Sequence, residues 1–245
     1  MQQYYNEIVS ISQRIYDSSR ATKDEITLLE NYPHIFVLSC VMDRQSKYIK
    51  TSEIPFQIAD KLGGLNFKLF SDKSEKWYID FFKEKKLHRF PHKMAVSFYK
   101  AIQKIKNDYN GNAGLIWNDN PTSAELVYRF LEFDGVGIKI ATMATNILSR
   151  DYGVKIKDHY AIDISPDIHV KRTMYRLGLL PEQENIDFSQ IDSTKVIYKA
   201  KSINPTFPGL MDLAFWEIGT KKICTNKKCN SKNCPFGDIC KKQGI

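Results

Sequence analysis

The chain has 245 residues, of which 42% are hydrophobic and 12% aromatic, enough for one large domain or two small ones. Its formal net charge of +8 favours an anionic partner such as nucleic acid. No apolar run approaches the roughly 20 residues that cross a bilayer, and the first residues lack the pattern of a signal peptide. We therefore expect a cytoplasmic protein that binds no membrane and acts as a monomer.

Helical periodicity dominates the first half of the chain. Helix ends are marked by Gly63 and Gly64, by Asn110 and Gly111, and by a capping residue at Thr122 or Ser123. Apolar residues recur at spacings of three and four over residues 4–20, 34–50, 53–63, 93–112 and 123–133. This pattern predicts a mostly α protein with short, numerous helices.

Two glycines interrupt the next helical run, in the stretch FDGVGIKIA at residues 133–141. A glycine inside a helix costs about 1 kcal/mol relative to alanine, so Gly135 and Gly137 predict a turn between two helices. The N–H groups that open the second helix point outward and form an anion site, suited to a DNA phosphate. A tight helix–helix turn with a solvated Lys139 is the alternative.

After the second hairpin helix, apolar and polar residues alternate as they do in a strand. Residues 154–165 predict either a short hairpin or an irregular excursion. Asp167 then precedes a helix whose Val170, Met174 and Leu177 share one face. An aspartate at this position commonly caps the helix. His169, at the start of the same helix, is expected to be structural.

Four cysteines gather near the end of the chain, in the spacing Cys-x4-Cys-x4-Cys-x5-Cys. They are Cys224, Cys229, Cys234 and Cys240, and in a reducing compartment such a set favours metal ligation over disulfides. Zinc sites with four cysteines usually show Cys-x2-Cys pairs, which this segment lacks, so a [4Fe-4S] cluster is preferred to zinc. Cys40, distant in an apolar run, is interpreted as a core residue.

The same segment carries much of the positive charge of the chain. Residues 221–245 hold seven lysines and one aspartate, for a net charge of +6. Lys227, Lys228 and Lys232 lie between the cysteines and are candidates for phosphate contact. A solvated lysine-rich face is the alternative.

Together, FDGVGIKIA and the later SPDIHVKR resemble the helix-hairpin-helix motif and the aspartate loop of the endonuclease III (HhH-GPD) superfamily of DNA glycosylases. The family motif is Leu-Pro-Gly-Val-Gly-x-Lys-x-Ala, and this chain departs from it at Phe133 and Asp134. Many relatives also end in a [4Fe-4S] loop, with the spacing Cys-x6-Cys-x2-Cys-x5-Cys. Here the first-to-last span and the final spacing match, while the second cysteine is shifted.

The resemblance implies an all-α fold with two helical lobes. A six-helix barrel containing the helix-hairpin-helix is expected over residues 31–151. The second lobe, formed by both termini, is expected over residues 1–30 and 152–245, with the cluster loop at 224–240.

The resemblance also implies a function in base-excision repair. Lys139 falls on the lysine that attacks the sugar in bifunctional members, and Asp167 on the essential aspartate. The expected partner is double-stranded DNA carrying a damaged, mismatched or modified base that is flipped out of the helix, which would make the protein nucleoid-associated. Arg44 or Gln45 occupies the region where relatives place a residue that enters the duplex, and a solvent-facing helix end is the preferred alternative.

Two other functions remain open at this point. A monofunctional glycosylase would use Asp167 to cleave the base while Lys139 contributes only charge. A non-enzymatic protein could use the hairpin and the cluster loop solely for contacts with DNA phosphates. The motifs do not specify which base is removed.

Overall fold

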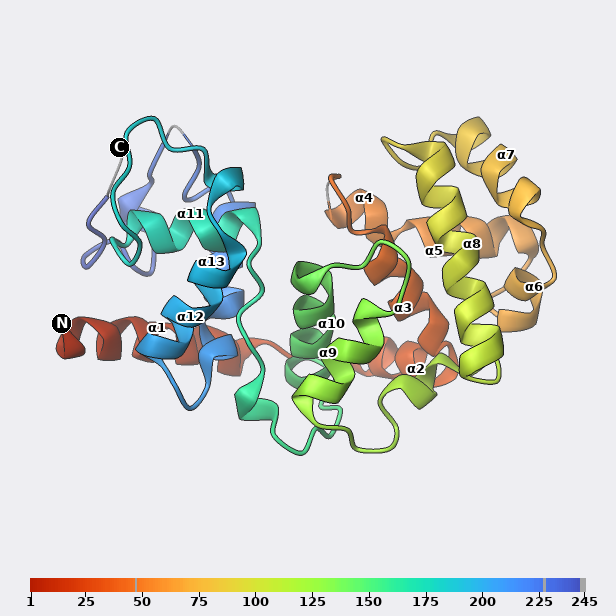
Figure 1. Ribbon diagram of the computed structural model, residues 1–245, viewed down its shortest axis with the longest axis horizontal. Coiled ribbons are helices and arrows are strands. Elements are labelled where there is room, and N and C mark those ends of the chain that lie inside the picture. The colour runs from red at the N-terminus through yellow and green to blue at the C-terminus, as the bar shows by residue number, and fades with distance from the viewer. Residues whose placement is uncertain (47, 227, 243–245) are drawn as a thin grey trace. The chain divides into compact units, whose positions relative to one another are not determined.

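The structure is a computed structural model, and it describes residues 1–46, 48–226 and 228–242. Within these residues the chain is built from helices, and its β-pairing is an isolated bridge between Cys224 and Cys229 (Figure 1). No helix in this described part is long and apolar enough to cross a membrane. The expected all-α class is confirmed.

The helices of the first half of the chain are α1 (Gln2–Ser18), α2 (Lys23–Asn31), α3 (Pro33–Met42), α4 (Tyr48–Ser52), α5 (Ile54–Leu62), α6 (Phe67–Ser71), α7 (Glu75–Lys85), α8 (Pro91–Asp108) and η1 (Ala113–Ile116). Those of the second half are α9 (Ser123–Leu131), α10 (Ile138–Arg150), η2 (His159–Ala161), α11 (Ile168–Arg176), η3 (Phe188–Gln190), α12 (Ser193–Ile203), η4 (Pro208–Met211), α13 (Asp212–Thr220) and η5 (Ser231–Asn233). The η elements are short 3-10 helices.

The chain divides into two compact units. The central unit comprises Ala21–Ala144 and Tyr152–Lys157. The terminal unit comprises Met1–Arg20, Thr145–Asp151 and the described residues from Asp158 onward. The division falls inside α10, so this one helix contributes residues to both units.

The central unit is organised around α3, whose residues are almost all apolar and buried. A helix that is apolar on every side belongs in a core, and α3 packs against α2, α5 and α8. The helices α7 and α8 also pack against each other, through buried Phe82 and Phe98, whose ring centroids lie 5.6 Å apart. The central unit therefore has its own aromatic core.

The terminal unit is organised around the pair α11 and α13, with α1 packed against α13. Val170 and Met174 of α11 and its C-cap Leu177 all belong to the hydrophobic core of this unit. Phe215 of α13 packs edge-to-face on Phe236 from the cysteine segment, with centroids 5.5 Å apart. The cysteine segment is thus attached to the core of this unit.

The strand-like segment at residues 154–165 is irregular and contains only the short helix η2. Its internal backbone hydrogen bonds are the turns around η2, such as Ala161 N–H to the Asp158 carbonyl (2.6 Å), and other groups pair with separate elements. Lys157 N–H donates to the carbonyl of Pro121 (3.0 Å), and the Ile162 carbonyl accepts from Gly209 N–H (2.9 Å). Of the two alternatives, the irregular excursion is the one observed.

Candidate functional site

The two glycines lie in a turn between two helices, as predicted. Helix α9 begins with a capping box, in which Thr122 N–H donates to the Glu125 carboxylate (2.7 Å) and Glu125 N–H donates to the Thr122 hydroxyl (3.2 Å). Helix α10 begins just after Gly137, whose carbonyl accepts from the N–H of Ile140 and of Ala141 (3.0 Å each). The chain thus forms a helix-hairpin-helix, and the start of its second helix is the kind of position that favours an anion.

The two positions that depart from the family motif have structural roles in this turn. Phe133 is buried and lies parallel to the ring of Tyr109, with centroids 6.5 Å apart. The Asp134 carboxylate accepts hydrogen bonds from Ser97 (2.8 Å) and Lys100 (3.1 Å), both on α8. The bond from Ser97, followed by that from Lys100, lowers the pKa of Asp134. These residues fasten the turn to α8.

Gly135 and Gly137 occupy different environments. Gly135 has φ +80°, a left-handed conformation that favours glycine, and a Cβ atom there would overlap the guanidinium of Arg44. Gly137 has no neighbouring atom within 4 Å of the position of a Cβ, and its φ is not positive. The fold itself therefore requires glycine at 135, whereas the surface beside 137 is open.

Lys139 lies in the first turn of α10 and forms an ion pair with Asp43, with Nζ and Oδ2 2.5 Å apart. The Lys139 side chain is 29% exposed and that of Asp43 only 9%. Sequence reasoning missed Asp43, although an acidic residue that directly follows the buried run of α3 was a usable signal.

Arg44 and Gln45 follow Asp43 in the same loop. The Arg44 guanidinium lies against Gly135, and its Nη1 atom is buried with no hydrogen-bond partner in the described residues. Gln45 is exposed and has φ 48°. The structure therefore brings Arg44 to the hairpin turn, while Gln45 stands at the surface.

His88 anchors this loop to the segment between α7 and α8. Its Nδ1 atom accepts from Phe90 N–H (3.1 Å), so Nε2 carries the proton and donates to the Arg44 carbonyl (2.8 Å). Burial lowers the pKa of His88, which keeps the ring neutral. The loop that carries Asp43 and Arg44 is thereby held in place.

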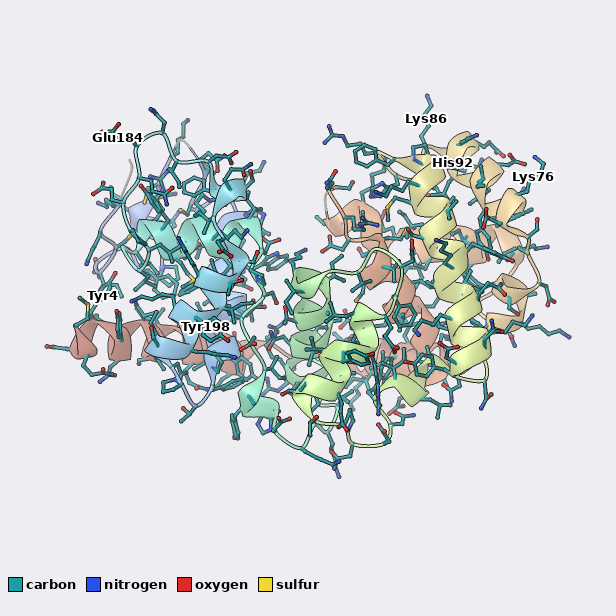
Figure 2. All side chains as sticks on the ribbon, in the orientation of Figure 1. Tyr4, Lys76, Lys86, His92, Glu184 and Tyr198 are labelled. Atoms are coloured by element: carbon teal, nitrogen blue, oxygen red, sulfur yellow. The ribbon has the colours of Figure 1, made fainter. Side chains whose placement is uncertain are left out.

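The segment around His88 is a basic surface that sequence reasoning also missed. Residues 83–93 contain five lysine or arginine residues and one glutamate, for a net charge of +4, and all six of these side chains are exposed. Figure 2 shows Lys86 and His92 at the same end of the α7–α8 pair. The Lys50 ammonium donates to the Lys86 carbonyl (3.1 Å), which brings a further cation to this surface. The signal was available as a charge run between two helices.

Asp167 caps α11 in the terminal unit, as the common use of an aspartate predicts. Its Oδ1 atom accepts from His169 N–H (2.8 Å), and its own N–H donates to the Ser165 carbonyl (2.7 Å). The buried Asp212 accepts from Ser165 N–H (2.8 Å) and so holds the residues that precede α11 in place. Burial raises the pKa of Asp212 to about 6, against the opposing effect of Arg150.

The four cysteines gather on a loop of the terminal unit. Cys224 is buried and the other three are partly buried. Burial raises the pKa of Cys234 to about 11, and the negative charges of Cys240, Cys229 and Cys224 add to this effect. In the part of the chain that is described, no group of three or more His, Cys, Asp or Glu side chains is arranged to hold a metal ion. A zinc ion would need its sulfur ligands about 2.3 Å from one centre.

Two buried arginines of α11 face this loop. Arg172 donates to the Asn226 side chain (3.1 Å), and Arg176 donates to the Asn226 carbonyl (3.0 Å). The thiol of Cys240 donates to the Arg176 carbonyl (3.4 Å). Arg172 also donates to His169 Nδ1 (2.7 Å), which gives that histidine its expected structural role. The cysteine loop therefore lies beside two buried cations.

The lysines between the cysteines are only partly described. Lys228 and Lys232 are exposed, and Lys227 lies outside the described residues. The predicted residues thus fall into two groups. Lys139, Arg44 and the hairpin glycines belong to the central unit, whereas Asp167, the cysteines and the described tail lysines belong to the terminal unit.

No protein-family model and no curated protein matches the sequence. Among solved structures, the chain is similar to that of a trapped endonuclease III–DNA covalent intermediate, the estranged-adenine complex. The similarity has a TM-score of 0.66 at 13% sequence identity, and it covers 99% of this chain and 96% of that one. At this identity the likeness establishes the fold. The chain has the all-α, helix-hairpin-helix fold of endonuclease III.

Proposed function

We propose that the protein is a base-excision DNA glycosylase with AP lyase activity, in which Lys139 is the nucleophile and Asp167 the catalytic carboxylate. The observation that carries this proposal is the position of Lys139. It lies in the first turn of the second hairpin helix, in a chain that folds as endonuclease III does. The solved structure that the chain resembles is a covalent endonuclease III–DNA intermediate. A lysine at this position is suited to forming such a bond with a sugar.

The chemistry follows from the two side chains. Neutral Lys139 would attack C1′ of a flipped nucleotide, and the resulting Schiff base would permit β-elimination of the strand. Asp167 would stabilise the positive charge that develops on the sugar as the base departs. Because Asn caps helices about as well as Asp, Asp167→Asn should keep the cap on α11 while abolishing base release.

DNA binding is supported by the surfaces of the central unit. The open site beside Gly137 and the helix start can receive one phosphate. The exposed basic surface of residues 83–93 can receive others, and it is linked to the hairpin through His88 and Arg44. The described tail lysines, Lys228 and Lys232, add positive charge in the terminal unit. The proposed partner is duplex DNA with a damaged, mismatched or modified base.

We also propose that Cys224, Cys229, Cys234 and Cys240 hold a [4Fe-4S] cluster. Such a cluster lies between its four ligands as a body several atoms across, so its cysteines stand farther apart than those of a zinc site. The buried Arg172 and Arg176 would offset its negative charge. When bound, the cluster would fold the loop that carries the tail lysines. Purified protein should contain iron and acid-labile sulfide in equal amounts, and stoichiometric zinc without sulfide would contradict the assignment.

A second candidate is a monofunctional glycosylase, which follows if the ion pair of Lys139 with Asp43 stays intact throughout the reaction. A lysine that is held permanently as an ammonium ion contributes charge but cannot attack a sugar. In that enzyme Asp167 would direct water to the flipped nucleotide.

Borohydride trapping distinguishes these functions. Anaerobically prepared protein is incubated with duplexes that carry an abasic site or one of a panel of damaged bases, alongside Lys139→Gln. A covalent adduct that is lost in the variant supports the lyase. Base release without an adduct, converted to a nick by alkali, supports the monofunctional enzyme. DNA binding that persists with neither activity on any substrate supports a non-enzymatic role.

A further inference from the structure

Asp43 and Lys139 both lie at the unfavourable ends of their helices. Asp43 follows the last residue of α3, where its N–H donates to the Cys40 carbonyl (3.1 Å). Its carboxylate therefore lies near the negative end of the α3 dipole. Lys139 lies in the first turn of α10, at the positive end of that helix. Each placement costs about 0.3–1 kcal/mol relative to the opposite charge. Helix stability does not account for either residue.

The carboxylate of this ion pair is also shielded from water. The Asp43 side chain is only 9% exposed, and its Oδ2 atom lies 2.5 Å from Lys139 Nζ. Removing two charges from water is expensive, so shielding reduces the advantage of the ammonium–carboxylate pair over the neutral amine and acid. The geometry is that of a proton donor and acceptor in direct contact.

The carboxylate is held in this position by the surrounding backbone. The next residue, Arg44, accepts from His88 through its carbonyl (2.8 Å), and its N–H donates to the Met42 carbonyl (2.7 Å). Asp43 thus stands between a buried helix and an anchored loop. A catalytic base needs this kind of fixed position.

We propose that Asp43 is the general base that activates Lys139. The inference rests on the proposed lyase function. In the step, an Nζ–H bond of the Lys139 ammonium breaks and its electron pair stays on the nitrogen. The proton forms an O–H bond with Asp43. The products are a neutral amine, which is competent to attack C1′, and a neutral carboxylic acid.

The test is single-turnover borohydride trapping on an abasic-site duplex at pH values from about 6 to about 9.5. Asp43→Asn should form the Schiff base about 100-fold more slowly than wild type near pH 7. The deficit should shrink as pH rises, because solvent then deprotonates the lysine directly. Asp43→Glu, which keeps a carboxylate, should recover part of the rate. Asp72→Asn, an exposed aspartate that follows α6 in the same way, should match wild type.

Other outcomes overturn the proposal in distinguishable ways. If Asp43→Asn traps DNA as fast as wild type, or faster near pH 7, Asp43 is a counterion that masks the lysine and not a base. If wild type releases bases but never traps, the lyase function fails and this proposal fails with it. Should Asp43→Asn not fold, Asp43→Ser is assayed with and without added formate. A rate that formate does not raise would equally contradict a base at this position.

Discussion

The hairpin glycines permit a matched pair of substitutions with opposite expected effects. Gly135→Ala should destabilise the central unit by about 1–2 kcal/mol, the cost of placing an L-residue in the left-handed region. The φ of +80° at this position leaves alanine no unstrained alternative. The added methyl would also displace the Arg44 guanidinium, which can swing away because it is the end of a flexible side chain.

Gly137→Ala should leave stability within about 1 kcal/mol of wild type. No atom lies within 4 Å of the new methyl group, and φ is not positive. A poorer helix start is offset by the lower entropy of the unfolded chain. If a DNA phosphate approaches the backbone here, however, the methyl occupies its space. DNA affinity should then fall although the fold is intact.

The assays are urea unfolding, for the free energy, and DNA binding at two salt concentrations. Gly135→Ala is expected to lower the urea midpoint, and Gly137→Ala to weaken binding at an unchanged midpoint. Equal destabilisation by the two variants would refute the conformational argument. Wild-type binding by Gly137→Ala would refute the phosphate site.

Three further predictions concern buried titratable groups and surface charge. Burial raises the pKa of Asp212 from 3.8 to about 6, so between these pH values the folded state binds a proton that the unfolded state has lost. The free energy of unfolding therefore falls by about 3 kcal/mol as pH rises from about 4 to about 6. Asp212→Asn should remove this loss, and urea unfolding between about pH 4 and 6.5 measures it; an unchanged pH slope would contradict the buried carboxylate. Burial lowers the pKa of His34 from 6.5 to about 4, so between these pH values the unfolded state binds a proton that the folded state does not. The free energy of unfolding therefore falls by about 3 kcal/mol as pH drops from about 6.5 to about 4. His34→Gln should abolish this acid sensitivity. If the free energy of unfolding of the variant depends on pH as that of wild type does, the prediction is wrong. Replacing Lys86 and Lys93 together by Glu should weaken DNA binding and make the salt dependence shallower, whereas an unchanged salt slope would show that the 83–93 surface faces no phosphates.

Local patterns in the sequence were sufficient for several parts of the molecule. The glycines at 135 and 137 indicated a turn because low helix propensity is intrinsic to glycine and needs no distant partner. Thr122 or Ser123 indicated a helix start from local sequence, and the structure shows Thr122 as the cap, with Glu125 completing a capping box. The inner face of α11 followed from the spacing of its apolar residues. The all-α class, inferred from this periodicity and from the family resemblance, is confirmed by the structure.

Tertiary structure decided what depends on residues far apart in the chain. The alternation of residues 154–165 suggested a hairpin or an irregular excursion. A strand needs a partner strand, and here Lys157 and Ile162 pair instead with Pro121 and Gly209. Asp43 and Lys139 are 96 positions apart, so no local pattern could join them. The contact of the Arg44 guanidinium with the hairpin turn and the approach of the α11 arginines to the cysteine loop also depend on residues far apart in the chain. Periodicity specifies which face of a helix is buried, whereas the packing of helices decides which side chains meet.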